Sequence, residues 1–589
     1  MSNTNTAPRS RQLRRKPLAI GLAAAIACAS VRAEPPAVMR PDGDFVLPVT
    51  NCDDAGPGSL RDVLASAFSG AHVAFVPGIG CNLVTLTSGP IVIANDAGGQ
   101  PIALLDITGL GRDQLTIDGG NVDRVFVHDA GTDAVLTLKD LAIAHGRGDG
   151  DGGCVFAEGN IALSNVAISE CKAGVVSGDV ALGTAPVRGG GLYAGNSATL
   201  ENSLVSANQA YGNAVYAYGG GVFAVSAITL TSSTIDQNAV HSDGGASYGG
   251  GIAAGDRAGH VQAAVTLTSS LVTSNTADSA CDFCGVRGGG VWVYGNSTFS
   301  GGEISGNGAA SSAGYGTGGG LYFNAHFGGA PVSATVTGTH FHCNTSDNSG
   351  GAIAAGGDLT ISRAILDCNS ALKDGGGIVL LGGNLTLIDS TLMANIAVDR
   401  GGGIFLFGYG DVATSNSTIS GNVAANGGAI GNTYGSLHLA NSTIAFNQAF
   451  EHGGGVYQRY AYYPFDLRST IVAGNTGSAG PEDLWPPGMT VTGSNDLVVA
   501  AAGVDLPDDT LSADPLLGPL TLNGGPTLTH ALGEGSPAID AGSNDAALDF
   551  DQRGEGFVRV YGLAADIGAF EVQPAPPPDS IFIDGFDPS

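Results

Sequence analysis

The chain has 589 residues and an acidic balance, with 53 Asp and Glu against 23 Lys and Arg and a formal net charge of -30 at pH 7. Such a chain repels nucleic-acid phosphates, which excludes a nucleic-acid-binding role, and it disfavours acidic polysaccharides unless a divalent cation bridges the two surfaces. Charged residues make up only 13% of the chain and glycines number 95, so we expect an ordered protein that uses glycine in tight turns.

The first 33 residues predict a secretory signal peptide. Five basic residues precede an apolar stretch over 18–29, and Val31-Arg32-Ala33 is typical of a cleavage site. A membrane anchor is the alternative, but this stretch of about 12 residues is shorter than the roughly 20 that a spanning helix needs. Twin-arginine export and a lipidated Cys28 are further alternatives. We expect export through the inner membrane to the cell surface or the extracellular space, with no later transmembrane segment.

The region from 34 to 135 predicts an N-terminal cap with irregular first coils, which would cover strand edges left open at the end of a solenoid. From 136 to 475 a unit recurs about every 25 to 37 residues. It contains a glycine cluster such as Gly375-Gly376-Gly377, two short apolar runs and an Asn turn such as Asn395. Periods of this length with no helical pattern predict an all-β solenoid whose coils are turns of a parallel β-helix.

The turn asparagines occupy one position of the repeat. An Asn tolerates a left-handed backbone and can hydrogen-bond its neighbours, so we expect each Asn at a sharp turn and the set stacked as an internal ladder. The set is Asn208, Asn238, Asn275, Asn307, Asn344, Asn369, Asn395, Asn422, Asn447 and Asn475. Inserts before the glycine clusters, over 276–287 and 308–317, are expected to project as loops from one edge, where binding can evolve.

The residue after each glycine cluster is aliphatic and is expected to point inward, which turns the next residue outward. That outward position is often aromatic. We expect these rings to stack on each other and brace the solenoid, because Ala253, Val379 and Gly431 interrupt the series. The alternative is an exposed strip that binds a ligand, and these rings are the candidate binding site. The aromatic residues are Tyr193, Phe223, Trp292, Tyr322, Phe405 and Tyr457.

Eight cysteines follow the leader, and sequence proximity pairs them as four disulfides. Cys343 and Cys368 each precede a ladder Asn, so they occupy equivalent places in adjacent coils about 4.8 Å apart. The other pairs are Cys52 with Cys81, Cys154 with Cys171, and Cys281 with Cys284. A zinc half-site at Cys281 and Cys284 is the alternative, but no second half is present.

Glycine clusters stop at about 476. The segment 476–572 predicts a closing module, and 573–589 is a Pro-rich linker with a short tail. The charged residues of the closing module are interpreted as a salt-bridged cap that seals the last coil, with His530 packed inside it. A functional site is the alternative. The charged residues are Asp540, Arg553, Asp566 and Glu571.

Several motifs carry family resemblances. The repeat over 136–475 resembles those of chlamydial polymorphic outer membrane proteins, which implies a right-handed parallel β-helix of the pectate lyase type and an adhesin-like surface role. The segment Cys52-Asp53-Asp54 to Asp62 is similar to an N-terminal motif of secreted bacterial β-helix proteins. Gly524-Gly525-Pro526, Asp551-Gln552-Arg553-Gly554 and Asp566-Ile567-Gly568 resemble the choice-of-anchor Q domain, which implies export and surface display.

Enzymatic motifs are weaker. Lyase chemistry on this scaffold needs clustered carboxylates holding calcium beside an Arg base, and hydrolysis needs a spaced carboxylate pair; neither pattern is visible. Asp149 and Asp151 could supply oxygen ligands for Ca²⁺, with a solvated loop as the alternative, and no other cofactor is expected.

The sequence therefore predicts an exported, non-catalytic, adhesin-like β-helix protein that binds a glycan or a protein. A polysaccharide lyase or glycoside hydrolase, and a passive structural protein of the envelope, are the alternatives. The oligomeric state is left open.

Overall fold

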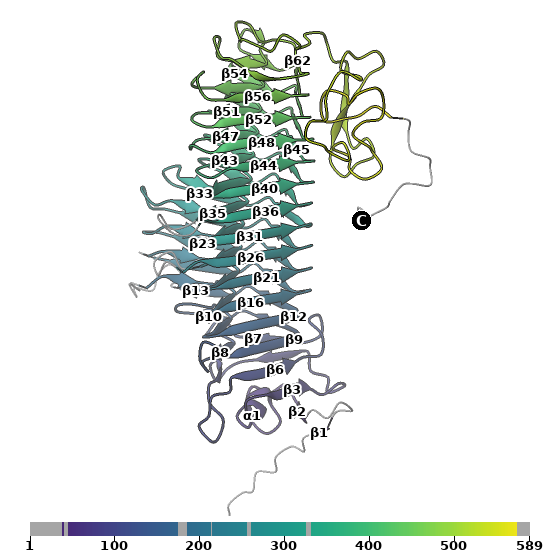
Figure 1. Ribbon diagram of the computed structural model, residues 1–589. Helices are drawn as coiled ribbons and strands as arrows, with labels where there is room; N and C mark the ends of the chain where they lie inside the picture. The colour runs from purple at the N-terminus through teal and green to yellow at the C-terminus, as the bar shows by residue number, and fades with distance from the viewer. Residues whose placement is uncertain are drawn as a thin grey trace, which may run out of the picture. The chain divides into compact units, whose positions relative to one another are not determined.

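The computed structural model describes residues 38–39, 45–174, 185–213, 215–255, 261–324 and 331–573. Within these ranges nearly every element is a short β-strand, and strands of successive coils pair in parallel (Figure 1). The described strands form sheet 1 with 30 strands, sheet 2 with 14, sheet 3 with 13 and the short sheet 4 with five. The predicted all-β parallel β-helix is confirmed. The leader over 1–33, Cys28 and the tail over 574–589 lie outside the described residues.

One coil shows how the repeat folds. After a glycine cluster, β39 (Ile353–Gly356) joins sheet 2, β40 (Asp358–Ser362) and β41 (Ile365–Asp367) join sheet 1, and β42 (Ser370–Ala371) joins sheet 3. The next coil begins with β43 (Ile378–Leu380). Coils also lie outside 136–475, because β2 (Phe45–Val49) already pairs in parallel with β3 (Ala71–Phe75).

The side chains alternate as expected. In β43, Ile378 and Leu380 belong to the continuous core inside the coils, whereas Val379 between them belongs to a second, separate apolar cluster. The same division holds in β35 (Leu321–Asn324), where Leu321 and Phe323 point inward. In these coils an outward side chain of sheet 2 therefore meets a second layer of protein rather than water.

The predicted Asn ladder is confirmed, but the prediction that each Asn itself has a left-handed backbone conformation is wrong. Asn369 accepts from the backbone N–H and side-chain amide of Asn344 at 2.9 and 3.0 Å, and donates to Asn395 at 2.9 Å. The residue before the Asn takes the positive φ, as at Cys368 with 60°. The bend one residue earlier aims the Asn side chain into the core, where it finds its partners.

The ladder ends in an acid. Asn475 donates through its backbone N–H and its side chain to one oxygen of Asp483, at 3.1 and 2.8 Å. Since every bond from one ladder residue to the next runs toward the C-terminus, the final member needs only to accept, and a carboxylate is an acceptor. Burial raises the pKa of Asp483 to about 6.

Both ends of the core are closed. At the N-terminal end, α1 (Leu60–Leu64) buries Leu60, Val63 and Leu64 in the core cluster, after Ser59 caps its first turn (Figure 1). At the other end β62 (Leu497–Val498) is the last strand of sheet 1, and Met489 and Val491 complete the core.

A side module over 512–573 contains the hairpin β63 (Leu517–Thr521) and β64 (Thr529–Leu532). It lies against sheet 1 at β45 (Thr391–Met393), β49 (Thr418–Ser420) and β53 (Thr443–Ala445), three successive coils (Figure 1). The residues expected to seal the last coil thus belong to a module that covers the side of the solenoid.

All four predicted disulfides are present, between Cys52 and Cys81, Cys154 and Cys171, Cys281 and Cys284, and Cys343 and Cys368. The inserts are more ordered than loops. The insert over 276–287 contributes β28 (Thr276–Ser279) to sheet 3 and β29 (Val286–Arg287) to sheet 4. In the part of the chain described, no helix is long and apolar enough to cross a membrane.

Candidate functional site

The structure places most of the predicted aromatic strip below the surface. Phe223, Trp292, Tyr322 and Phe405 are at most 4% exposed, whereas Tyr193 and Tyr457 are half-buried. Tyr218 and Tyr248, from strands of sheet 4, pack over the strip; the rings of Tyr248 and Trp292 lie 5.0 Å apart. The outward direction was predicted correctly, but a second layer of side chains covers these rings.

The covering layer consists of the residues that immediately precede the glycine clusters, here called the pre-glycine column. Its members stack in register from coil to coil, first as sheet 4 and then as isolated parallel bridges joining Thr317 to Ser349 and Asp374 to Arg400. Arginines of this column lie over rings of the strip: Arg188 is 5.6 Å from Phe223, and Arg400 is 4.3 Å from Phe405.

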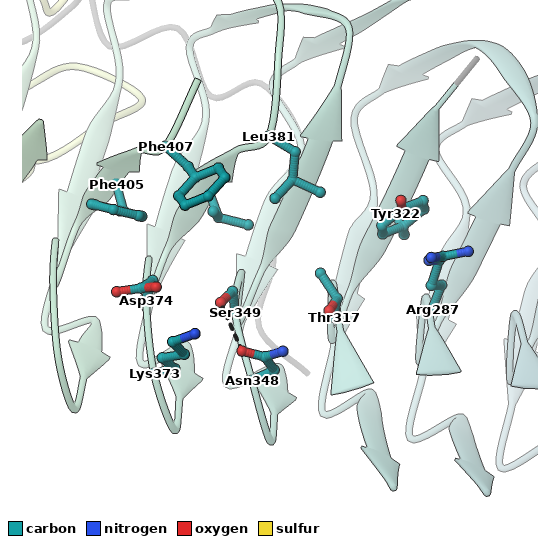
Figure 2. Close-up of a pocket in the computed structure, with 11 residues that line it drawn as sticks. Arg287, Thr317, Tyr322, Asn348, Ser349, Lys373, Asp374, Leu381, Phe405 and Phe407 are labelled. Atoms are coloured by element: carbon teal, nitrogen blue, oxygen red, sulfur yellow. Dashed lines mark hydrogen bonds between the residues drawn. The ribbon is translucent and has the colours of Figure 1, made fainter. Parts of the chain in front are cut away.

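A groove opens where this covering thins. Val379 replaces a ring on the strip, while Ser349 and Asp374 replace tyrosines in the column, and a cavity of about 230 Å³ results (Figure 2). One wall is the pre-glycine edge of four coils: Arg287, Thr317, Asn348, Ser349, Lys373 and Asp374. The facing wall is apolar and comes from the strip and its continuation: Tyr322, Val379, Leu381, Phe405 and Phe407.

The polar wall is held by charge pairs. Asp374 is buried and accepts two hydrogen bonds of 2.9 Å from the guanidinium of Arg400. Burial raises the pKa of Asp374, although Arg400 opposes the shift. Arg287 lies 5.3 Å from the ring of Tyr322, and Lys373 is exposed at the rim. The groove thus offers cationic, amide and hydroxyl groups opposite an apolar wall, which is the composition of a small-molecule or glycan site.

A row of tyrosines, some exposed and some half-buried, continues from the apolar wall. Phe407 is 51% exposed, and Tyr409, two residues later, is 82% exposed. Tyr409 stacks on Tyr434 of the next coil at 5.2 Å, and Tyr434 stacks on Tyr460 of the following coil at 5.6 Å. Tyr462 and Tyr463 extend the group in the same turn. These turns join sheet 2 to sheet 1, so the tyrosine row runs along one edge of the solenoid.

Asp149 and Asp151, predicted as calcium ligands, are not part of this surface. The carboxylate of Asp151 accepts from Arg188 at 3.2 Å, and burial raises its pKa. In the regions described, three ligand atoms of His, Cys, Asp or Glu converge within 4.8 Å of one another at one group, and that group contains neither residue. A calcium site at Asp149 and Asp151 stays a prediction.

The charged residues of the side module are structural. Arg553 binds Asp551 at 2.6 Å, and its guanidinium lies between the rings of Phe557 and Phe570, at 3.9 and 3.8 Å. Asp540 and Glu571 accept backbone N–H groups, and Asp566 accepts from Asp540 and Val572. His530 is buried and contacts Ser420 at 2.9 Å, as its packed role predicts.

Sequence reasoning missed the groove and the tyrosine row. The groove had a signal, since Arg188, Arg287 and Arg400 each stand directly before a glycine cluster. The tyrosine row had a weaker one, a Tyr within a few residues of the strip position in three successive repeats. Which rings are covered depends on contacts between columns, which the period of the repeat does not determine.

The comparisons with known proteins are sparse. No family model matches the chain, and no curated protein matches it. The resemblances to polymorphic outer membrane proteins and to the choice-of-anchor Q domain therefore stay predictions. Among solved structures, the chain is similar to the crystal structure of pectate lyase Pel9A at 12% identity, covering 90% of this chain and 98% of that one with a TM-score of 0.22. So distant a likeness assigns no chemistry to this protein.

Proposed function

We propose that the protein is an exported, non-catalytic β-helix protein that binds a glycan along the groove and the tyrosine row. The observation that carries the proposal is the continuity of the two. The apolar wall passes through Phe405 and Phe407 into Tyr409, and coils repeat this surface at a strand spacing of about 4.8 Å. A chain ligand built from repeated units fits a surface built the same way.

The chemistry suits sugars. A pyranose presents an apolar C–H face and a rim of hydroxyls; tyrosine rings pack against the first, and Arg, Asn and Ser side chains hydrogen-bond the second. Exposed aromatic groups of this size are uncommon on surfaces that bind nothing. Four disulfides indicate an oxidising compartment, which supports export.

The test is retention on a panel of neutral and acidic polysaccharides by the secreted chain, with and without Ca²⁺, while reducing and unsaturated ends are assayed. We expect retention without product. Tyr409→Ala and Tyr434→Ala should each weaken binding about tenfold, since interface aromatics are worth about 1 kcal/mol or more. Lys373→Ala should also weaken glycan binding, because it removes a cation from the lining of the groove.

Tyr315→Ala is the matched control, because Tyr315 is 45% exposed but lines neither the groove nor the tyrosine row. Release of product would replace the proposal with a lyase or hydrolase. Absence of retention on every glycan, or retention that none of the three variants changes, would contradict the proposed surface and leave a protein ligand or a structural role.

A further inference from the structure

Two histidines stand side by side on the outer face of sheet 1, away from the groove. They belong to β37 (His340–His342), where Phe341 between them is fully buried, so strand alternation points both imidazoles outward. In the next coil β41 pairs His342 with Asp367. Oδ1 of Asp367 lies 2.6 Å from Nε2 of His340 and 3.0 Å from Nδ1 of His342. One carboxylate oxygen is thus shared by two ring nitrogens.

Other surface histidines also contact carboxylates of neighbouring coils, but each offers a single ring. His145 lies between Asp118 and Glu170, and His241 contacts Asp243 and Asp278. In the described part of the chain, the ligand atoms of His340, His342 and Asp367 alone form a group of three within 4.8 Å.

We propose that His340, His342 and Asp367 bind one divalent transition-metal ion of the zinc class. Two imidazole nitrogens and one carboxylate oxygen are a ligand set that Zn²⁺ prefers, whereas Ca²⁺ and Mg²⁺ prefer oxygen alone. In a tetrahedral site with bonds of about 2.0–2.1 Å, ligand atoms lie about 3.4 Å apart. The two separations to Asp367 would lengthen by roughly 0.4 and 0.8 Å, which side-chain rotation supplies.

The backbone around the group is fixed in advance. Cys343 follows His342, and Cys368 follows Asp367. The disulfide between these cysteines holds the two strands together, with the two Cys Cα atoms 4.4 Å apart. In the preceding coil Glu303 pairs in register with His340. This register makes the Glu303 carboxylate a candidate fourth ligand, and water is the other candidate for the open position. A pre-positioned ligand set loses less entropy on binding the ion.

Without an ion the group is explained as a hydrogen-bonded ion pair. Burial alone would lower the pKa of His340, but the hydrogen bond and charge of Asp367, together with Glu303, raise it. A proton and a metal ion thus compete for the same nitrogens, and only a binding experiment separates them.

The experiment is isothermal titration calorimetry of the disulfide-intact, chelator-treated chain with Zn²⁺ and, separately, Ni²⁺ at pH 7.5. We expect one ion per chain. His342→Ala and, as a more conservative change, Asp367→Asn should each weaken binding more than about 100-fold, because even residues that only support a ligand are worth 10- to 100-fold. Cobalt(II) substitution should give d–d absorption bands that His342→Ala removes.

His241→Ala is the control, since it removes an imidazole between two carboxylates on another face and should leave affinity unchanged. Absence of saturable binding by the unmodified chain would overturn the proposal. So would Zn²⁺ affinity that His342→Ala and Asp367→Asn leave intact, or that His241→Ala lowers equally. Circular dichroism of each variant confirms that the coils are retained.

Discussion

At the scale of single residues, the solenoid is held by polar side chains that sit inside it. Each ladder Asn uses all of its hydrogen-bonding capacity on partners in neighbouring coils: Asn369 also donates to the carbonyl of Phe341 at 2.9 Å. Buried amides cost stability unless they are paired, so the ladder is both necessary and fragile.

Replacing one ladder residue should therefore be expensive. Asn369→Ala removes the acceptor of the Asn344 backbone N–H and of one Asn344 side-chain N–H, together with the side-chain donor to the Phe341 carbonyl, all in the core. We expect a loss of about 3 kcal/mol in the free energy of unfolding, measured by urea denaturation. Asn384 makes a similar ladder with Asp358 and Asp411, but in water. Asn384→Ala should lower the free energy of unfolding by less than about 0.5 kcal/mol. Equal losses in the two variants would mean that burial does not determine how much a ladder residue contributes to stability.

A second polar column, of serines and threonines, also ends in an acid. Asp496 is fully buried and accepts from the Thr470 N–H at 3.0 Å; burial, the largest cause, raises its pKa to about 8. Between about pH 4 and pH 8 the unfolded chain releases this proton and the folded chain keeps it. The contribution of Asp496 to stability therefore falls as pH rises through that window.

Asp496→Asn removes this linkage and keeps the shape of the side chain. We expect the variant to be more stable than the parent at pH 8.5, by on the order of 2 kcal/mol, and nearly equal to it at pH 4. Thermal unfolding followed by circular dichroism across that range measures the difference. Asp411→Asn, on an exposed residue, serves as the control and should follow the parent curve. A parent and variant with parallel pH profiles would show that Asp496 does not titrate in this window.

At the scale of the strand and turn, glycine clusters exist because coils approach each other backbone to backbone. A Cβ built on Gly376 would lie 2.5 Å from backbone atoms of Ile396 and Gly402, none of which can move aside. Gly382, in the nearby turn, has open space around the same position.

This contrast makes a matched pair. We expect Gly376→Ala to lower the free energy of unfolding by about 3 kcal/mol or to prevent folding, since overpacking forces backbone shifts. Gly382→Ala should express and melt like the parent. Soluble yield and the midpoint of urea denaturation provide the comparison, and a well-tolerated Gly376→Ala would mean that the coils can separate locally.

These elements also mark how far sequence reasoning reaches. Glycine clusters, the inward aliphatics after them and the Asn ladder repeat in every coil, so the strand order, the core and the equivalent positions of Cys343 and Cys368 could be predicted. The left-handed position at Cys368 could not, because Cys, Ala, Ser and Gly all occupy it and share no side-chain signature. The burial of Trp292 could not either, since Tyr218 and Tyr248, which cover it, lie in other coils.

At the scale of the whole molecule, the faces of the solenoid differ in which coils are covered by other parts of the chain. Sheet 1 is covered by the side module at Thr391, Thr418 and Thr443, which are buried, whereas the equivalent Leu271 in an earlier coil is 40% exposed. On the groove side, the pre-glycine column covers the strip most fully near Tyr218 and Tyr248, and the covering opens at Ser349 and Asp374. The proposed glycan-binding surface therefore belongs to the later coils.

Gln552 makes several of the hydrogen bonds that dock the side module on the solenoid. It is fully buried, its amide oxygen accepts from Thr418 at 2.6 Å, and its NH₂ donates to Thr391, Thr527 and the carbonyl of Leu528 at 2.9 to 3.1 Å. Gln552→Ala removes the acceptor of the buried Thr418 hydroxyl and the donors that Gln552 supplies across the interface, whereas the bonds of Thr391 to Leu528 and of Thr527 to Asp389 remain. We expect docking to weaken by about 2–4 kcal/mol. Limited proteolysis should then cleave within 512–573 at least about tenfold faster, since cleavage follows the population of the opened state. The coils should stay protected, because the hydrogen bonds between one coil and the next do not involve Gln552.

The control is Gln448→Ala, on an exposed side chain of sheet 3, which should leave the cleavage rate unchanged. Loss of protection over the whole chain in Gln552→Ala would instead show that the side module and the solenoid unfold as one unit.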